Sequence, residues 1–200
     1  STAEYYVYAV VSGAKNYADK TGASAVKLGT IKVADANEWT TEFAVEDFTY
    51  DKADDASNHV NGWEAVHKDS KTIEYKAALA EDDAYSSDAA DIPVDAGEYN
   101  ARITVKADGY ADLIKIVTFT ISKKELDDIV IADIDEQVYE GSAVEPDVKA
   151  TSEIYGGEIP AAMYSVEYSD NEAAGTGKVV VTITDKNYIG SEEKTFKITA

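Results

Sequence analysis

The segment Tyr99–Lys106, with the sequence YNARITVK, carries the pattern that decides the fold. Apolar side chains occupy every second position from Tyr99 to Val105, and Asn, Arg, Thr and Lys stand between and after them. A period of two is typical of a β-strand that has one face against a core and the other in water. The segment Gly177–Ile183 repeats the pattern with Gly, Val, Val and Ile. The sequence therefore predicts an all-β protein.

The same landmarks recur along the chain at a spacing of about 80 to 90 residues, which suits a small β-sandwich domain and is too long for a solenoid repeat. Each copy has a strand start containing Ala, a turn followed by an aromatic residue, and a closing strand. The strand starts are Ala3–Tyr5, Ala96–Tyr99 and Ala174–Gly177, the turns with their aromatic residue are Gly13–Tyr17, Asp108–Tyr110 and Lys186–Tyr188, and the closing strands are Thr30–Ile31, Phe119–Ile121 and Phe196–Ile198. We therefore interpret the chain as copies of one folded module.

The turn before the aromatic residue contains Asp108-Gly109 in one copy and Asp185–Asn187 in the next. Glycine and asparagine tolerate a positive φ, which tight hairpins require. We therefore expect left-handed backbone at Gly109 and Asn187.

This register divides the chain into one partial and two complete modules. Residues 1–34 hold the back half of a module, as a hairpin, while residues 35–122 and 123–200 each form a sandwich. Since no Pro-, Gly- or Ser-rich linker separates them, we expect the modules to abut. The acidic stretch Ala80–Tyr85 is extra in the second module and predicts a surface loop or an added hairpin. Helix is nearly absent, with Ala77–Asp83 as the one weak candidate.

The half-module at residues 1–34 needs another part of the protein to cover its open edge and apolar face. A lone hairpin is marginal in water and leaves an open edge. Its outward positions, Tyr6, Tyr8 and Val10, are more apolar than their counterparts in the second module. We therefore expect the hairpin to pack either on the second module or on another copy of the chain, which would be self-association.

A set of short motifs marks the third copy, namely Tyr139–Gly141, Pro146, Tyr164–Asn171, Ala174–Thr176 and Asn187–Gly190. In this set the third copy resembles the bacterial Ig-like and MBG modules, which occur in tandem in large secreted and cell-surface proteins. The second copy shares Phe48–Asp51, Asp95–Tyr99 and Gly109-Tyr110, but has Lys52 where that family has glycine. The resemblance implies tandem Ig-like β-sandwiches. It also implies roles as stalks, adhesin spacers or accessory modules of glycan-acting enzymes.

The composition narrows the partners and the location. Aspartate and glutamate number 39 against 18 lysines and arginines, so the formal net charge is −21. Such a charge repels nucleic acid and anionic membranes, and no apolar run is long enough to insert into a bilayer. The absence of cysteine suits either the cytosol or the exported proteins of anaerobic or Gram-positive-type bacteria. Because the modules repeat, we expect an extracellular fragment of a longer cell-surface polypeptide, with its other modules as partners.

No pattern of catalytic or metal-binding residues stands out. His59 and His67 are the only histidines, and the Gly-x-Ser-x-Gly motif of hydrolases is absent. The oxygen-rich stretches Asp51–Asn58 and Glu81–Asp91 lack the ligand spacing of a calcium loop, so we interpret them as solvated acidic loops. We predict no enzyme activity, catalytic residue, metal or cofactor.

Aromatic residues give the stronger functional signal. Trp39 and Trp63 are the only tryptophans, and both fall in the second module. An exposed indole stacks on the apolar face of a pyranose, and His59, Asn61 and His67 stand near Trp63 in the sequence and could add hydrogen bonds. The alternative is that the tryptophans fill a core or a junction. The leading hypothesis is a non-enzymatic structural or adhesive spacer, and the second is a carbohydrate-binding module whose partner is a glycan or a host surface.

Overall fold

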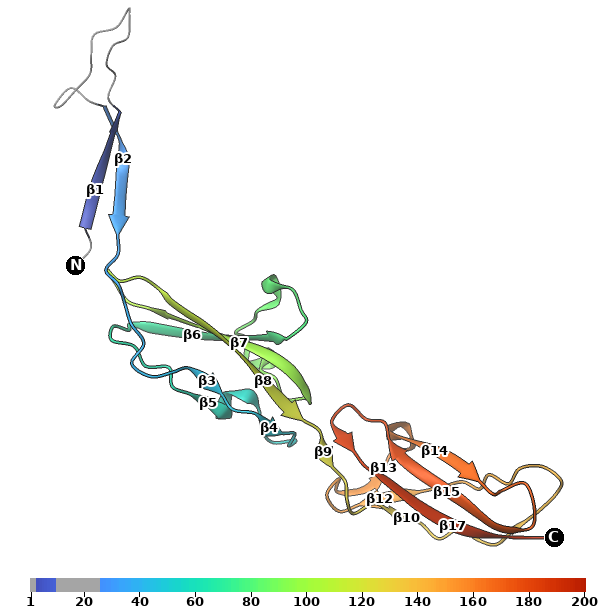
Figure 1. The fold of residues 1–200 in the computed structure, drawn as a ribbon. Helices are drawn as coiled ribbons and strands as arrows, with labels where there is room; N and C mark the ends of the chain where they lie inside the picture. The colour runs from blue at the N-terminus through green and yellow to red at the C-terminus, as the bar shows by residue number, and fades with distance from the viewer. Residues whose placement is uncertain (1–2, 10–25) are drawn as a thin grey trace, which may run out of the picture. The chain divides into compact units, whose positions relative to one another are not determined.

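The structure is a computed structural model that describes the backbone of residues 3–9 and 26–200 and the side chains of residues 33–200. In this part of the chain every regular element is a β-strand or a short 3-10 turn (Figure 1). The prediction of an all-β protein is therefore confirmed. Backbone contacts divide the chain into two compact units. The first unit comprises Ser1–Val45, Val60–Ile92 and Asn100–Thr118, and the second comprises Glu46–His59, Pro93–Tyr99 and Phe119–Ala200.

The two N-terminal strands form the expected hairpin. Strand β1 (Ala3–Ala9) pairs antiparallel with β2 (Val26–Val33), and the register shifts between Val7 and Tyr8. The side chains of Tyr6 and Tyr8, the residue Val10 and the turn Gly13–Tyr17 lie outside the described residues. The expectation that this hairpin is covered stays a prediction.

The first unit is built around the strands that the alternating pattern predicts. Besides β1 and β2, its strands are β3 (Ala44–Val45), β5 (Val60–Asn61), β6 (Ser70–Ala77) and the larger parts of β7 (Gly97–Lys106) and β8 (Leu113–Ser122). Strands β8, β7 and β6 are neighbours in one sheet, and β3 pairs with β5 in another. The inward side chains Ala101, Ile103 and Val105 are each 0% exposed. The predicted inward face of Tyr99–Val105 is thus confirmed for these three.

The acidic insertion Ala80–Tyr85 lies in a hairpin that the pairing of Tyr75 with Ser86 closes. Tyr75 and Ser86 exchange two backbone hydrogen bonds of 2.8 and 3.0 Å. Between them the chain makes a turn and then a 3-10 turn at Asp82–Ala84, so the expectation of helix over Ala77–Asp83 is wrong. The physical reason is the pairing of Tyr75 with Ser86 together with a local bond, in which the Lys76 amine donates to the Ala80 carbonyl at 2.6 Å across a non-helical turn.

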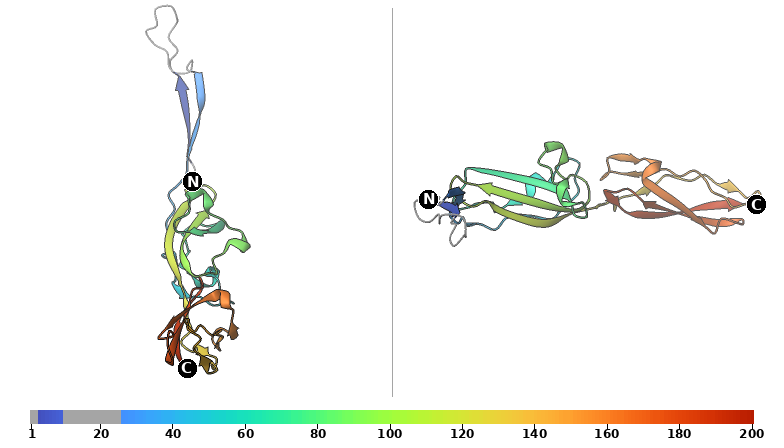
Figure 2. Two further views of the ribbon diagram at one scale, coloured as in Figure 1. Left: turned by 90° about the vertical axis from the view of Figure 1, so that its right-hand side faces the viewer. Right: turned by 90° about the horizontal axis from the view of Figure 1, so that it is seen from above.

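The C-terminal part of the second unit consists of two layers of strands (Figures 1 and 2). One sheet has the order β11 (Gln137–Val138), β17 (Ser191–Thr199), β15 (Gly175–Ile183) and β14 (Tyr164–Ser169), and the other has the order β10 (Val130–Ile131), β12 (Ala150–Ser152) and β13 (Gly157–Ile159). The β15 residues at the predicted inward positions, Gly177 to Ile183, are all buried. They form one hydrophobic core with residues from the facing sheet, such as Ile131 and Ile159.

The second unit also contains residues that precede Lys123. Strand β4 (Phe48–Thr49) pairs parallel with the end of β8, and β9 (Lys124–Glu125) pairs parallel with β16 (Tyr188–Ile189). The ring of Tyr188, which is 4% exposed, contacts Tyr50 and Tyr155 edge-on at centroid distances of 5.3 and 5.4 Å. Residues from both sides of the predicted boundary at 122/123 therefore share one compact unit.

The left-handed backbone expected in two turns, at Gly109 and at Asn187, occurs in one of them. Gly109 has a φ of +80°, so its left-handed backbone is confirmed. Among the described non-glycine residues a positive φ occurs at Asp170 alone, so the expectation for Asn187 is wrong. Asn187 is buried instead, where its Oδ1 accepts the Ala96 N–H at 2.8 Å and its Nδ2 donates to Asp95 at 2.7 Å. Asn187 therefore contributes through the hydrogen bonds of its side chain and not through a left-handed backbone.

Candidate functional site

The two tryptophans lie on a pair of chain segments that run antiparallel in the first unit. Thr40 donates its N–H to the Glu64 carbonyl and Val66 to the Glu38 carbonyl, both at 2.9 Å. Gly62 interrupts this pairing with a φ of +65°. A β-carbon at Gly62 would lie 1.6 Å from the Glu42 carbonyl oxygen, so only glycine fits here. The kinked pairing holds Trp39 opposite Ala65, and Trp63 next to the kink.

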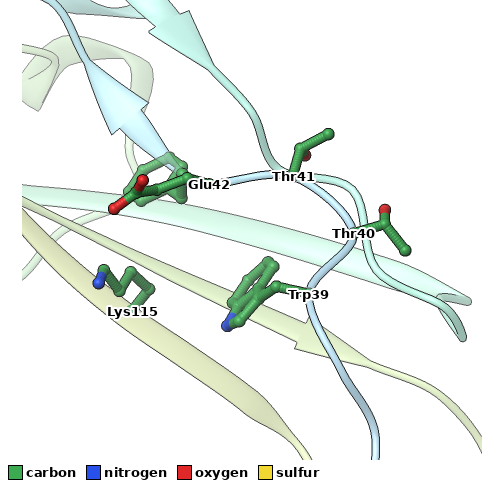
Figure 3. A pocket seen from close by; sticks show the side chains of 6 residues that line it. Trp39, Thr40, Thr41, Glu42 and Lys115 are labelled. Atoms are coloured by element: carbon green, nitrogen blue, oxygen red, sulfur yellow. The ribbon is translucent and has the colours of Figure 1, made fainter.

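Trp39 lines a cavity of about 280 Å³. The other lining residues are Thr40, Thr41, Glu42, Phe43 and Lys115. Figure 3 shows the Trp39 indole and the Lys115 side chain on the same side of the segment, while Thr40 and Thr41 point away from them. Phe43 at the base is 2% exposed, so this cavity is an extension of the core toward the surface.

Trp63 lines a separate cavity of about 200 Å³. The other lining residues are Lys68, Asp69, Ser70, Lys71 and Val105. The Nζ atoms of Lys71 and Lys68 lie 3.3 and 4.7 Å from the centroid of the Trp63 ring, which is the geometry of a cation–π contact. Desolvation, followed by the charge of Lys68, lowers the pKa of Lys71. This cavity therefore joins an aromatic surface to two positive charges.

The two histidines make local contacts in different surroundings. The His59 ring stacks on Phe48 at a centroid distance of 3.8 Å, and its Nε2 lies 2.8 Å from the Asp54 carboxylate. This hydrogen bond is the largest cause of the lowered pKa of Asp54. The His67 ring stacks on Tyr110 at 3.7 Å. Both histidines thus have structural partners.

Asn37 is a buried residue that the sequence did not single out. Its Nδ2 donates to the His67 carbonyl at 2.8 Å, and its Oδ1 accepts the N–H groups of His67 and Glu38 at 3.1 and 3.0 Å. The side chain is 9% exposed, so these bonds are sheltered from water. Asn37 fixes the segment that carries Trp39 to the segment that carries His67. An Asn at a loop position gave no sequence signal for this role.

The five residues predicted for glycan binding thus have five different surroundings. Trp39 and Trp63 line separate cavities, His59 contacts Phe48, His67 contacts Tyr110, and Asn61 is an exposed residue of β5. Trp63 is the member whose ring lies against two ammonium groups, and these belong to lysines that the sequence did not single out. The sequence signal that could have indicated them is the presence of Lys68 and Lys71 around the start of β6, in a strongly acidic chain. Ligand binding by these residues stays a prediction.

The acidic stretches bond locally. Asp55 accepts the Ser57 N–H at 2.8 Å and the Ser57 hydroxyl at 2.5 Å, and Asp54 accepts the Asn58 amide at 2.9 Å. In the part of the chain that the structure describes, no group of three or more His, Cys, Asp or Glu side chains could hold a metal ion. Nor does any helix among the described residues have the length and apolarity to cross a bilayer.

Comparison with known protein families gives a match for the C-terminal part of the chain. Residues 128–200, which contain strands β10 to β17, match the MBG domain family. A search of curated proteins finds no match to the chain. The matched segment carries the motifs Tyr139–Gly141 and Asn187–Gly190 and includes the whole of the four-stranded sheet around β15. Residues 128–200 therefore form an MBG-type module.

Proposed function

We propose that the chain is a non-enzymatic spacer segment of a bacterial cell-surface or secreted protein, built of tandem Ig-like modules with boundaries near residues 34 and 122. In this role it holds an adhesive or catalytic part of the same polypeptide away from the envelope. The observation that carries the proposal is the second compact unit, which joins residues 46–59 and 93–99 to residues 119–200. A spacer needs such joints, because a freely bending chain does not hold its two ends at a fixed distance.

The joint within the second unit rests on backbone and side-chain contacts together. Lys124 donates its N–H to the Asn187 carbonyl at 2.9 Å, and Leu126 donates to the Ile189 carbonyl at 2.8 Å. Leu126 is 1% exposed and belongs to the core of the MBG-type module. The strand that follows residue 122 is therefore anchored where it enters this module.

Aromatic and polar side chains strengthen the same joint. The rings of Tyr50 and Tyr155 enclose Tyr188, and aromatic pairs of this kind are worth about 0.5–1.5 kcal/mol each beyond the area they bury. Asp95 accepts from Lys186 at 2.5 Å and from Asn187 at 2.7 Å. A force that separates the residues before 123 from those after it has to break these contacts together. The contacts therefore support the resistance to force that a spacer needs.

The charge supports the same role. A net charge of −21 favours solubility and self-repulsion of neighbouring chains, as suits a segment crowded on a surface. The absence of cysteine leaves the cores to supply the stability without disulfides.

The test is a distance measurement by electron spin resonance. Because the chain has no cysteine, spin labels can be placed at Ser57→Cys and Ser191→Cys, two exposed positions of the second unit. We expect one narrow distance distribution, and a broad one after Tyr50→Ala. Tyr85→Ala is the matched control, since Tyr85 contacts Lys76 and Arg102 in the first unit. A broad distribution in the unsubstituted chain would contradict the spacer.

A second function, carbohydrate binding by the module that holds Trp63, is supported by one observation. The indole is only partly buried and lines a cavity. Titration of tryptophan fluorescence with a panel of polysaccharides tests it, and the absence of any response would exclude it.

A further inference from the structure

Two lysines converge on the Trp63 ring. The Nζ of Lys71 lies 3.3 Å from the ring centroid and that of Lys68 lies 4.7 Å from it. The two ammonium groups repel each other, and the ring quadrupole offsets this repulsion only in part. In a chain with 39 acidic and 18 basic residues, a pair of neighbouring lysines would ordinarily be matched by carboxylates.

The carboxylates near this cavity are already engaged. Glu64 forms its ion pair with Lys68, and Asp69 accepts the N–H of Asp108 at 2.7 Å. Among the described residues, no carboxylate forms an ion pair with Lys71. Desolvation and the charge of Lys68 are the causes that lower the pKa of Lys71, and no opposite charge counters them. The cavity lining thus carries two ammonium groups and the Asp69 carboxylate, and Lys71 has no ion-pair partner within the described part of the chain.

The remaining walls define what else a ligand must have. The Trp63 indole gives the cavity an apolar surface, whereas Val105, which also lines it, is 0% exposed and offers a ligand no accessible surface. Ser70 adds a hydroxyl group at the rim. The volume of about 200 Å³ is smaller than the roughly 300–1,000 Å³ of pockets for drug-sized ligands, so the cavity suits a single sugar ring.

We propose that Trp63, Lys68 and Lys71 bind a pyranose that carries a carboxylate, such as a uronic acid unit of an acidic polysaccharide. The pyranose takes the place of the Lys71 ammonium over the indole and stacks its apolar C–H face there. Its carboxylate accepts hydrogen bonds from the two ammonium groups. Bonds between charged partners are about twice as strong as neutral ones and would select the acid over a neutral sugar. The inference deepens the carbohydrate-binding candidate and does not depend on the spacer function.

The chain offers a matched control for this site. The Trp39 cavity also combines an indole with a lysine, Lys115, but the carboxylate-bearing Glu42 lines it as well. The Trp63 cavity has an acidic lining residue too, Asp69, but two lysines stand against it. The Trp39 cavity sets a single lysine against Glu42, so an acidic sugar would find no excess of positive charge there. Lys115→Gln and Trp39→Phe therefore remove the same kinds of group from a cavity that we do not expect to bind the acid.

The experiment is a calorimetric and fluorescence titration of the full chain with D-glucuronate, D-glucose and acetate. We expect glucuronate to bind, and glucose and acetate to bind at least about tenfold more weakly, because each lacks one of the two recognised features. Lys71→Gln should weaken glucuronate binding about tenfold, while Lys115→Gln should leave it unchanged. The fluorescence change should vanish in Trp63→Phe and persist in Trp39→Phe.

The contrary outcomes separate the proposals. Equal binding of glucose and glucuronate would overturn the acid recognition and leave carbohydrate binding in place. Equal binding of acetate and glucuronate would reduce the site to a simple anion site and overturn the sugar. Binding that survives Lys71→Gln undiminished would also overturn the inference, and this exposed lysine can be replaced without disturbing the core. No binding of any of the three would remove both the inference and, with the polysaccharide panel, the carbohydrate-binding candidate.

Discussion

Gly177 in β15 lies directly opposite Phe196 in β17, and a β-carbon on Gly177 would lie 2.5 Å from the Cζ of the phenyl ring. The glycine leaves the space that Phe196 fills, and Phe196 is 4% exposed. In the preceding copy of the repeat Tyr99 takes the place of the glycine and stacks on Phe119 at a centroid distance of 5.7 Å. The two copies thus pack one strand pair in two ways.

Gly177→Ala should destabilise the protein by about 1–3 kcal/mol, because the added methyl group overpacks a filled core. Urea unfolding followed by circular dichroism measures this. Thr176→Ala, at the exposed neighbour, should change stability by less than about 0.5 kcal/mol. Adding Phe196→Leu to Gly177→Ala should recover part of the loss. Full stability of the single variant would show that the ring can move aside.

Gly62→Ala should cost at least about 2 kcal/mol, because the residue has a positive φ and its β-carbon meets the Glu42 carbonyl. The emission of Trp39 and Trp63 should shift as well, since both lie on the kinked segments. Gly156→Ala is the control, because its φ is +105° but nothing lies within 4 Å of its β-carbon. Equal losses in the two variants would mean that backbone strain alone matters and the clash does not.

Asn37→Ala should cost about 1–3 kcal/mol, because it leaves the buried N–H and carbonyl groups of His67 without their partner. Proton NMR of the His67 ring should show reduced ring-current shift from Tyr110 as the segment loosens. Asn58→Ala removes an exposed asparagine whose amide bonds Asp54, and should have little effect. An unchanged stability of Asn37→Ala would disprove the fixing role.

Asp95 should contribute to the pH dependence of stability. Hydrogen bonds from Lys186 and then Asn187 hold the pKa of Asp95 below its ordinary value of 3.8. Because the folded pKa is the lower one, the contribution is present above pH 3.8 and is lost as the pH falls through the folded pKa. Asp95→Asn should therefore be less stable at neutral pH and lose less stability on acidification below pH 4.

Urea unfolding at a series of pH values between 7 and 3 measures this difference in slope. Asp83→Asn, at an exposed carboxylate of the Asp82–Ala84 turn, should follow the unsubstituted protein. Parallel curves for Asp95→Asn and the unsubstituted chain would contradict the contribution of Asp95.

The strands could be predicted from the sequence because their signal is local. Alternation over Tyr99–Val105 and Gly177–Ile183 reports directly which side chains face a core, and the structure buries Ile103 and Val181 completely. The Asp108-Gly109 turn also has a local signal, because glycine adopts a positive φ, here +80°, without steric cost.

The candidate site could be predicted only in part because its neighbours are set by tertiary contacts. Trp63 stood out by its type, but the tertiary fold decides that the Lys71 ammonium lies over its ring. It also decides that the Glu42 carbonyl leaves no room for a β-carbon at Gly62. Asn187 likewise stood out as a turn residue, whereas its function is to bind Asp95. Proximity in sequence grouped His59 with Trp63, and the stacking of His59 on Phe48 had no sequence signal.

The enclosure of Tyr188 by Tyr50 affects how this repeat can be transplanted. A fragment that begins at residue 123 would lack Tyr50 and would therefore expose one side of the Tyr188 ring. Such a fragment would be more prone to aggregate. A designer who grafts the repeat onto a foreign scaffold should bring Glu46–His59 and Pro93–Tyr99 along. The unit that can be transplanted is therefore larger than the spacing of the repeats in the sequence suggests.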